Sequence, residues 1–332
     1  MKVSGLKVLV TGGAGFIGSH LADALAVENR VVILDDFSSG KRENIAHLLS
    51  HGSVTLVEGD IRDRDLLHDV LRDIDVVYHL AVRCLRVSIR EPHINHEVNA
   101  TGTLNLCTAA MERGVRRFVY VSSSEVYGTA RSVPMTEDHP CEPTTVYGAA
   151  KLAGQHYSLA CHKTYGLPAM AVIPFNTYGP REHFEGAYGE VIPKFVIRAL
   201  NGAAPVIFGD GSQTRDFTYV ADTVRGIILA SECDEMVGQS INIARGEEVQ
   251  IRDLASRIYG KLGQQIAPRF EKERPGDVRR HYAGVEKAAR LFGFRASVGI
   301  DEGLDMFVSW FRGQGFDVPQ LLQQDVVFNW EK

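Results

Sequence analysis

"VLVTGGAGFIGSHLADAL", residues 8–25, is the stretch that decides the fold. An apolar run leads into Gly12, Gly15 and Gly18, and an amphipathic run follows them. Gly12 would permit a tight turn, Gly15 would let a pyrophosphate approach a helix N-terminus, and Gly18 would allow close packing of helix on strand. A glycine-rich turn can also be purely structural, but glycines placed between a strand and a helix favour a dinucleotide-binding unit.

Short apolar runs rich in valine and isoleucine recur through the first half of the chain. They fall at residues 6–10, 31–35, 54–57, 75–80, 117–122 and 169–174. Longer helical stretches alternate with them, at residues 16–28, 64–72, 99–113 and 145–165. Such apolar runs suit strands that are buried on both faces, and the alternation is typical of βαβ units. The sequence therefore predicts an α/β fold with a Rossmann-type, doubly wound parallel sheet.

After residue 176 the pattern loosens, and glycine and proline become frequent. Helical stretches at 190–201 and 250–262 predict a smaller α/β substrate domain, whereas the helix at 219–231 and the strand-like "SINIA" after it should return to the sheet. The two domains would then interleave along the chain. The predicted boundaries are 1–176 plus about 219–243 for the dinucleotide-binding Rossmann domain, 177–218 plus about 244–312 for the substrate domain, and 313–332 for a C-terminal tail.

Composition excludes several classes of function. The 332 residues carry a net charge of −5 and no basic stripe, which argues against nucleic acid as a partner. No apolar run approaches the roughly 18 residues needed to span a bilayer, and no signal-peptide pattern precedes the first strand, so we expect no membrane attachment. The five cysteines are scattered without a CxxC pair, which predicts reduced thiols, a cytoplasmic protein and no metal site.

Carboxylates follow the second and third predicted strands. Asp35 and Asp36 end the second strand, where a carboxylate can bind both ribose hydroxyls and repel a 2′-phosphate. This position indicates NAD rather than NADP, although a carboxylate there can also be merely solvated. Asp60 and Ile61 follow the third strand, where the adenine edge would lie. Asp60 could equally cap the next helix.

A tyrosine and a lysine supply the candidate chemistry. Tyr147 and Lys151 lie four residues apart in a predicted helix, so they share a face. The lysine cation is expected to lower the pKa of the phenol, which would make Tyr147 a general base. Ser123 and Ser124, at the end of a predicted strand, could hold the substrate oxygen or relay the proton. The spacing also occurs by chance in exposed helices, but the preceding glycine loop and serines favour catalysis.

The chain resembles the extended short-chain dehydrogenases, specifically the NAD-dependent nucleotide-sugar epimerase/dehydratase group, and is similar to UDP-glucose 4-epimerases. The resemblance runs from residue 7 to about residue 280, in the expected order. It is carried by "TGGAGFIGSH", "LDDFSSGKREN", "GDIRD", "HLA" at 79–81, "NATGTLNL", "SSSEVYG", "YGAAK", "FNTYGPR", "VIPKF", "FGDGSQTRDFTYV" and "RPGDVR".

The resemblance implies a mechanism and two sets of contacts. Tyr147 would take the proton from the sugar O4 while the C4 hydride passes to NAD, giving a bound 4-keto sugar. Further residues at the cofactor would be Phe16, Ile17, Ser38, Gly40, Leu80, Ala81, Val82, Asn99, Ser122 and Pro174. Residues at the nucleoside diphosphate sugar, with UDP-hexose favoured, would be Asn176, Val191, Ile192, Lys194, Phe208, Arg215, Arg274, Asp277 and His281.

Within the second set, the resemblance implies that Asn176, Arg215 and Arg274 contact the diphosphate or nearby sugar oxygens. Phe208 would border the base, the backbone at Val191 and Ile192 would meet the base or ribose, and His281 would stand where sugar size is gated. Arginine suits phosphate because its fork is bidentate and always charged. The alternatives are surface ion pairs for the arginines, a turn cap for Asn176 and simple packing for His281.

The fate of the 4-ketone stays open, and Glu125 bears on it. Return of the hydride to the other face gives the C4 epimer without a further acid or base. Removal of the C5 proton, for which Glu125 could be the base, would let water leave from C6, as in a 4,6-dehydratase. Ser124 stands where dTDP-glucose dehydratases carry an acidic residue, so the acid for that step is missing.

We therefore expect a 4-epimerase, with a 4,6-dehydratase as the alternative, followed by a UDP-uronate decarboxylase or a 4-ketoreductase. A uronic acid would need a cation, for which Arg83, Arg86 and Arg181 are candidates unless they are merely solvated. A non-enzymatic NAD sensor is disfavoured because the Tyr–Lys pair is present. The family usually forms homodimers through the helices near 99–113 and 145–165, so a homodimer is expected.

Overall fold

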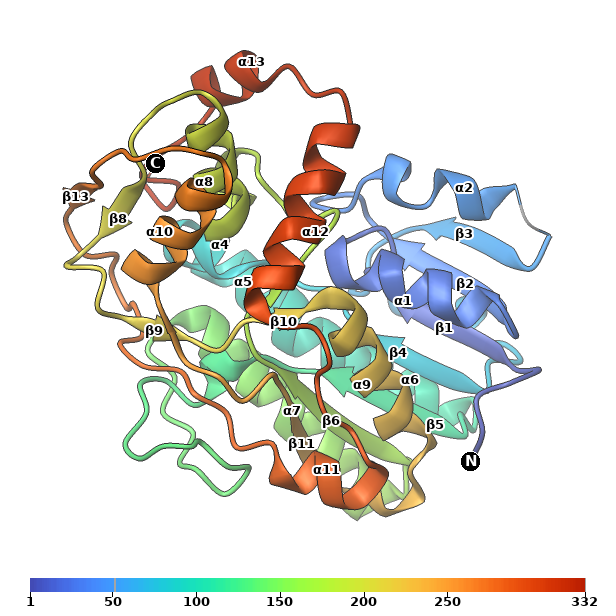
Figure 1. Cartoon of the computed structure of the whole chain (residues 1–332). Helices are drawn as coiled ribbons and strands as arrows, with labels where there is room; N and C mark the ends of the chain where they lie inside the picture. Colours follow the sequence, from blue (N-terminus) through green and yellow to red (C-terminus); the bar gives the residue numbers. More distant parts are fainter. Residues whose placement is uncertain (51, 332) are drawn as a thin grey trace.

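The fold centres on one seven-stranded sheet, seen in a computed structural model that describes residues 1–50 and 52–331 (Figure 1). The strand order is β11-β6-β5-β4-β1-β2-β3, and every neighbouring pair is parallel. The strands are β1 (Lys7–Thr11), β2 (Arg30–Asp35), β3 (Val54–Glu58), β4 (Val76–His79), β5 (Arg117–Val121), β6 (Ala169–Pro174) and β11 (Ser240–Ile243). The predicted Rossmann-type parallel sheet is confirmed.

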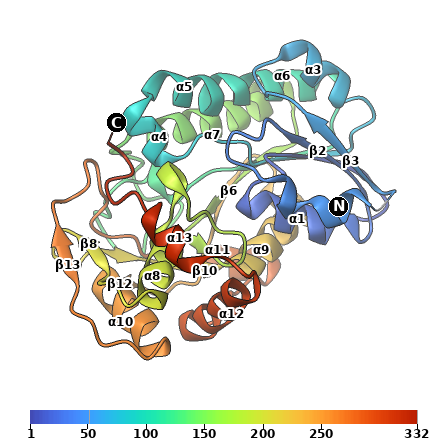
Figure 2. The same ribbon diagram turned by 90° about the horizontal axis from the view of Figure 1, so that it is seen from above.

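Helices cover both faces of this sheet (Figure 2). One face carries α3 (Arg64–Val70), α6 (Thr103–Glu112) and α7 (Val146–Tyr165), and the other carries α1 (Phe16–Ala26) and α9 (Val220–Glu232). Successive residues of a strand point to opposite faces, so Val8 and Val10 join the core beneath α1 while Leu9 joins the core beneath α3 and α6.

The predicted helix at 99–113 differs from the observed one. A π-helical segment, Glu97–Gly102, precedes α6, and the short helices α4 (Leu85–Arg90) and α5 (Pro92–His96) lead into it. Within this segment Gly102 faces the side chain of Ile61, since an added Cβ would lie 2.7 Å from the Ile61 Cδ1. π-helical turns are often found at functional sites.

A second set of elements lies beyond the carboxyl ends of the strands. Helix α8 (Val191–Leu200) packs against α10 (Ile251–Lys261), and β8 (Val206–Phe208) pairs in parallel with β13 (Arg269–Glu271). Short pairs link the two regions: β7 (Thr177–Tyr178) with β10 (Thr218–Tyr219), and β9 (Thr214–Arg215) with β12 (Val249–Gln250). The remaining elements are α2 (Ala46–Leu49), α11 (Glu286–Phe292), α12 (Ile300–Gly313), α13 (Val318–Gln323) and the 3₁₀ turns Arg42–Asn44, Ser124–Val126, Gly186–Tyr188 and Asp234–Met236.

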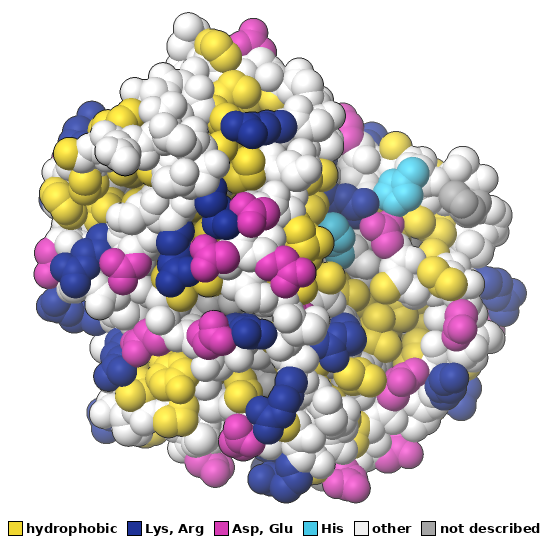
Figure 3. Space-filling view, in the orientation of Figure 1, with side chains coloured by type: hydrophobic (Ala, Val, Ile, Leu, Met, Phe, Trp, Pro, Cys, Tyr) yellow, Lys and Arg dark blue, Asp and Glu magenta, His cyan; other side chains and the backbone are white. Residues whose placement is uncertain are grey.

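The predicted tail, 313–332, is ordered over the residues that the structure describes, 313–331. It contains α13, and Trp330 near its end is buried. None of the described helices is long and apolar enough to cross a membrane. Acidic and basic side chains are interspersed over the face shown in Figure 3.

Candidate active site

Two pockets meet at the carboxyl end of the sheet. The first, here called the strand-end pocket, lies at the ends of β1, β2, β4, β5 and β6 and includes Gly12, Asp36 and Lys151. The second, the arginine pocket, lies among α8, β8 and β9 and includes Arg215 and Arg274. Both pockets are lined by Ser123, Glu125, Tyr147, Asn176 and Glu190. A reaction that joins ligands of the two pockets would therefore take place at these shared residues.

The glycine loop has the geometry that its sequence predicts. Gly12 has φ +69°, and an added Cβ would lie 2.7 Å from the Ala81 nitrogen. A Cβ on Gly18 would lie 2.1 Å from the Gly12 carbonyl oxygen, so helix α1 rests directly on the loop. Gly15 is the N-cap of α1, and no side chain caps this end. The uncapped amides border the strand-end pocket, which suits a pyrophosphate.

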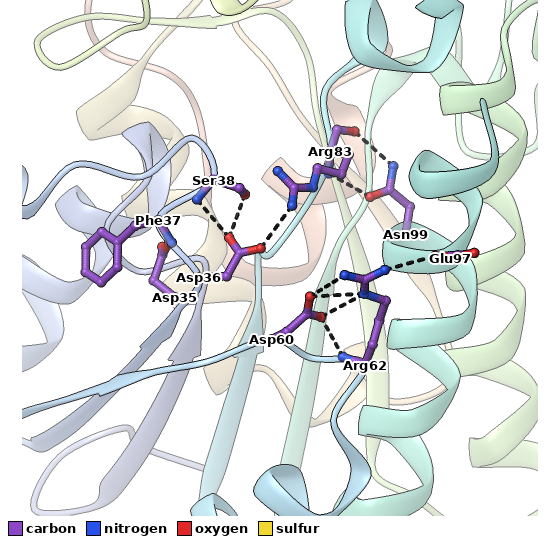
Figure 4. Close-up of polar contacts among 9 residues, drawn as sticks. All are labelled: Asp35, Asp36, Phe37, Ser38, Asp60, Arg62, Arg83, Glu97 and Asn99. Atoms are coloured by element: carbon purple, nitrogen blue, oxygen red, sulfur yellow. Dashed lines mark hydrogen bonds and ion pairs between the residues drawn. The ribbon is translucent and has the colours of Figure 1, made fainter. Parts of the chain in front are cut away.

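The two aspartates at the end of β2 differ in what they can bind (Figure 4). Asp35 is buried and accepts hydrogen bonds from the amides of Ala14 and Phe37, both at 2.9 Å. Burial raises the pKa of Asp35, against those two hydrogen bonds. Asp36 is more exposed; it forms an ion pair with Arg83 at 3.1 Å and accepts from the Ser38 amide at 3.0 Å. Both carboxylates line the strand-end pocket; Asp36 is the more exposed of the two, whereas Asp35 also binds the loop amides.

Asp60 does not cap a helix, so that alternative is wrong. Asp63 is the N-cap of α3 and accepts from the Leu66 amide at 3.0 Å. Asp60 instead binds the Arg62 guanidinium at 2.7 Å, and the same guanidinium donates to the Glu97 carboxylate at 2.9 Å (Figure 4). Asp60 and Ile61 both line the strand-end pocket.

Most of the residues predicted at the cofactor line this pocket, but Gly40 and Asn99 are not among its described lining residues. Asn99 lies behind the loop after β4, where it accepts from the Arg83 amide at 2.8 Å and donates to the Arg83 carbonyl at 3.0 Å. Gly40 makes room for Asp35, whose Oδ1 would lie 2.7 Å from an added Cβ. Both residues shape the pocket from behind. The lining includes Phe16, Ile17, Ser38, Leu80, Ala81, Val82, Ser122 and Pro174.

Lys151 is buried and Tyr147 is half-buried on α7, which packs against β5. The Lys151 ammonium donates to the Val121 carbonyl at 2.6 Å and lies 4.4 Å from the centre of the Tyr120 ring. Burial lowers the pKa of Lys151 to about 7. Burial also raises the pKa of the Tyr147 phenol, and its hydrogen bond with Ser123 opposes this only in part. The predicted lowering of the Tyr147 pKa is thus wrong for the protein alone, because burial outweighs the hydrogen bond with Ser123.

The two candidate serines face different ways. Ser123 hydrogen-bonds with Tyr147 and accepts from the Glu125 amide at 3.3 Å. Ser124 also borders the strand-end pocket, but its buried hydroxyl lies 3.5 Å from His281 Nδ1. Ser123 is therefore the serine placed beside Tyr147, whereas the expected contact of Ser124 with the sugar oxygen stays a prediction. The different directions follow from the 3₁₀ turn that begins at Ser124.

Glu125 lies where the two pockets join. Its Oε2 is buried and has no hydrogen-bond partner among the described residues. Burial raises the pKa of Glu125, against the guanidinium groups of Arg215 and Arg274. The side chain is thus poised to meet a ligand group rather than tied into the protein.

The arginine pocket contains a shared ion pair and buried groups without partners. Asp277 Oδ1 binds Arg215 at 2.7 Å and Arg274 at 2.5 Å. Arg215 also donates to the carbonyls of Thr214 and Val278. Arg274 Nε and Asn176 Oδ1 are buried without a hydrogen-bond partner among the described residues. Two guanidinium groups held by one carboxylate leave an excess of positive charge, which suits a diphosphate.

Sequence reasoning missed the role of Arg86 and Glu190 as a pair. Arg86 is nearly buried; it binds the Glu190 carboxylate and donates to the Tyr188 carbonyl at 3.1 Å. Although burial opposes it, Arg86 holds the pKa of Glu190 below its ordinary value. The two other candidate cations for a uronic acid are paired as well, Arg83 with Asp36 and Arg181 with Asp23 at 2.8 Å.

The structure places one predicted sugar contact away from the arginine pocket. His281 is fully buried, with Nε2 3.2 Å from the Gly128 carbonyl oxygen, and burial lowers its pKa to about 3. The Ile192 side chain joins the core, while its neighbour Val191 lines the pocket with Lys194 and Phe208; the expected contact through the backbone of Val191 and Ile192 stays a prediction. The prediction that His281 touches the sugar is wrong because Ser124 and Gly128 stand around its ring. His281 instead packs in the interior, which was the alternative to a sugar contact.

Comparison with known proteins places this geometry in a family. The family model described as GDP-mannose 4,6 dehydratase matches residues 9–307. The chain belongs to the NAD-dependent nucleotide-sugar epimerase/dehydratase family of extended short-chain dehydrogenases. The UDP-glucose 4-epimerase of Mycolicibacterium smegmatis is 37% identical over 93% of this chain and 99% of its own length.

Two solved structures of epimerase/dehydratase family members are similar throughout. The UDP-N-acetylglucosamine 4-epimerase of Methanobrevibacter ruminantium has a TM-score of 0.88 at 37% identity, covering 95% of this chain and 100% of that one. The dTDP-glucose 4,6-dehydratase DesIV of Streptomyces venezuelae, solved with NAD bound, has a TM-score of 0.88 at 34% identity, covering 93% and 97%. The family is therefore clear, while its members differ in reaction.

This epimerase/dehydratase family member has a pocket whose residues fit a dinucleotide. The close approaches at Gly12 and Gly18, the uncapped helix at Gly15 and the carboxylate of Asp36 together supply the turn, the anion site and the ribose acceptor. Among the described residues, no group of three or more His, Cys, Asp or Glu side chains could hold a metal ion.

Proposed function

We propose that this chain is an NAD-dependent nucleotide-diphosphosugar 4-epimerase, with a UDP-hexose as the favoured substrate. The strand-end pocket would take NAD and the arginine pocket would take the nucleoside diphosphate. The sugar would then lie at the shared residues, with its O4 beside Tyr147. The proposal is supported by the placement of these residues between the pockets and by the similarity to named 4-epimerases.

The residues of the chain would then divide the work. When bound, NAD supplies a hydride acceptor for C4 and a positive charge beside the phenol. Tyr147 accepts the proton from the sugar O4. Ser123, which hydrogen-bonds with Tyr147, would donate a second hydrogen bond to the same sugar oxygen. Lys151 brings an ammonium to the same helix face, fixed by the Val121 carbonyl. Tyr147 returns the proton to O4 once the ketone has been reduced on its other face.

The observation that carries epimerisation is that, of the described carboxylates shared by the two pockets, only Glu125 is unpaired, because Glu190 is bound by Arg86. Dehydration at C6 needs a base for the C5 proton and an acid for the departing hydroxyl. Glu125 can be one of these, but Ser124 turns its hydroxyl toward His281. Glu190 is engaged by Arg86, and its lowered pKa makes it a poor proton donor and a weak base. Epimerisation requires neither group.

The second candidate is a nucleotide-sugar 4,6-dehydratase, and Glu125 is the observation that favours it. The Glu125 carboxyl lies where the two pockets join, and its buried Oε2 has no hydrogen-bond partner among the described residues. A base that removes the C5 proton would need such a free oxygen. Decarboxylation of a uronic acid is less well supported, because Arg83, Arg86 and Arg181 are each already paired with a carboxylate.

Product mass separates these reactions. Purified protein is incubated with NAD and, in turn, UDP-glucose, UDP-N-acetylglucosamine, UDP-glucuronate, dTDP-glucose and GDP-mannose. We expect a new isomer of unchanged mass from at least one UDP-hexose. Loss of water would sink the epimerase in favour of the dehydratase, and loss of carbon dioxide would indicate a decarboxylase. Turnover that needs added reduced cofactor would indicate a ketoreductase, and NAD binding without any turnover would indicate a sensor.

We propose that Asp36 selects NAD over NADP, because a 2′-phosphate would meet its carboxylate. Asp36→Ala should weaken NAD binding about tenfold, since a charged hydrogen-bond acceptor for the ribose is lost. NADP binding should improve, because the repulsion is removed and Arg83 loses its partner. Dissociation constants from calorimetry check both, with the exposed Asp65→Ala as the matched control. Unchanged affinity for NAD and NADP in Asp36→Ala would show that this carboxylate does not bind the ribose hydroxyls.

We also propose a cytoplasmic homodimer that pairs through α6 and α7. These helices pack on each other, and Leu104 and Tyr157 on them are large side chains that remain exposed. Light scattering should then give twice the chain mass of 36.6 kDa. A mass of one chain at micromolar concentration would exclude a stable dimer.

A further inference from the structure

After α12 the chain folds back toward α8 and β8 (Figure 1), where its last residues border the arginine pocket. Helix α13 is held against α8, where Asn201 Nδ2 donates to the Val318 carbonyl at 3.0 Å. The residues after α13 then enter the lining, and the side chains concerned are Asp325, Val327, Asn329 and Trp330. A segment whose sequence carries no recognisable pattern thus forms part of the wall of a ligand pocket.

A buried charge cluster anchors the start of this segment. The Asp325 side chain is 6% exposed and lies between two cations of α8, Lys194 at 3.1 Å and Arg198 at 2.6 Å. Lys194 also donates to the Val326 carbonyl at 2.5 Å. Removal of one partner from such a buried cluster leaves an uncompensated charge, which is strongly unfavourable. Asp325 therefore fixes the segment on α8 at one definite place.

Asn329 anchors the end of the segment beside the start of α8. Its buried side-chain amide donates to the Gly189 carbonyl at 3.1 Å and approaches the Gly186 carbonyl at 3.5 Å. Gly189 directly precedes Glu190, which is the N-cap of α8 and one of the residues shared by the two pockets. The segment thus runs along α8, from Arg198 near its end to the loop before Glu190.

Directly after Asn329, Trp330 meets an aromatic surface. Its ring lies 4.6 Å from that of Phe208, at an interplanar angle of 76°, and only 4% of the residue is exposed. Phe328 joins both rings at 5.9 and 5.6 Å. The pocket therefore combines two guanidinium groups, which suit a diphosphate, with an aromatic surface, which suits the π-face of a base.

We propose that the C-terminal segment Asp325–Trp330 is the wall against which the nucleobase of the substrate packs, with Trp330 and Phe208 as its aromatic surface. This inference rests on the proposed function, because it takes a nucleoside diphosphate sugar as the ligand of the arginine pocket. Trp330 is then a specificity-determining residue that binds the base and takes no part in the chemistry at C4.

The chain offers a direct optical test, because Trp310 and Trp330 are its two tryptophans. Trp310 lies on α12 among Phe307, Phe311 and Phe316, outside the described lining of the pocket. In a Trp310→Phe protein the remaining fluorescence reports on Trp330 alone. Titration with UDP should change this fluorescence, whereas ribose 5-diphosphate, which lacks the base, should leave it nearly unchanged.

Affinity provides the second measurement. Trp330→Ala should weaken UDP binding about tenfold or more, the usual effect of deleting a base-stacking ring, and should leave ribose 5-diphosphate binding within twofold. Trp330→Phe keeps a ring and should retain most of the UDP affinity. Val326→Ala is the matched control, because Val326 belongs to the same segment but its side chain is exposed and does not line the pocket. Thermal unfolding of each variant verifies that the fold is intact.

The outcomes are distinct. A selective loss of UDP affinity together with the fluorescence change supports the inference. Unchanged UDP affinity in Trp330→Ala, or an equal loss of UDP and ribose 5-diphosphate, overturns it and leaves the proposed function standing. If the wild-type chain binds none of UDP, dTDP and GDP, the proposed function fails and the inference fails with it.

Discussion

Replacement of Tyr147 by phenylalanine should reduce turnover of the nucleotide sugar by about 10²- to 10⁴-fold, the usual contribution of a general acid–base group. The phenol is the group that hydrogen-bonds with Ser123 at the junction of the two pockets. Phenylalanine keeps the half-buried ring at this place, so the change removes the proton acceptor and little else. NAD binding should remain nearly intact, because the glycine loop and Asp36 are untouched. Product formation and calorimetric NAD titration together check both halves of this expectation.

Tyr165→Phe is the control for this variant. Tyr165 ends the same helix, α7, and is 68% exposed, so its hydroxyl can be deleted without touching either pocket. We expect it to behave as the wild type in both assays. If Tyr147→Phe kept more than about a tenth of the activity while Tyr165→Phe was normal, another group would have to be the base.

The second large effect is expected from Gly18→Ala. A Cβ at this position would lie 2.1 Å from the Gly12 carbonyl oxygen and 2.9 Å from the carbonyl carbon, which is backbone and cannot rotate away. The first turn of α1 must then move off the glycine loop. Overpacking of this kind destabilises a protein by about 1–3 kcal/mol. The shift would also displace the amides at Gly15, so NAD affinity should fall tenfold or more.

Gly260→Ala separates a local clash from a general effect of removing a helical glycine. Gly260 lies in α10, and an added Cβ there meets nothing within 4 Å. Alanine is the better helix former by about 1 kcal/mol, so this variant should be neutral or slightly more stable. Thermal unfolding and NAD titration of the two variants provide the comparison. Normal NAD affinity and stability in Gly18→Ala would mean that α1 does not need its close approach to the loop.

The parallel sheet and the glycine loop could be predicted because their signals are local. The apolar runs that became β1, β2 and β6 needed no knowledge of the rest of the chain, since a strand buried on both faces is apolar along its whole length. The π-helical segment before α6 could not be predicted in the same way, because Gly102 faces Ile61 from a distant part of the chain.

The candidate site shows the same division residue by residue. Tyr147 and Lys151 share a helix face whatever surrounds them, so their spacing alone brought them together. The directions of Ser123 and Ser124 could not be predicted, because they depend on a 3₁₀ turn and on His281, 157 residues further along the chain. The pKa of Tyr147 was predicted in the wrong direction, because spacing indicates a neighbouring charge but not the depth of burial.

The sequence by itself determined the parallel sheet, the dinucleotide loop, the Tyr–Lys pair and, through its motifs, the family. Each of these depends on residues that lie close together in the chain or on backbone conformations that only glycine adopts easily. The tertiary structure decided which groups meet at the reacting centre: the pairing of Arg86 with Glu190 across 104 residues, the isolation of Glu125 and the return of Trp330 to Phe208. Such contacts follow from how distant elements pack, and packing is a property of the whole folded chain.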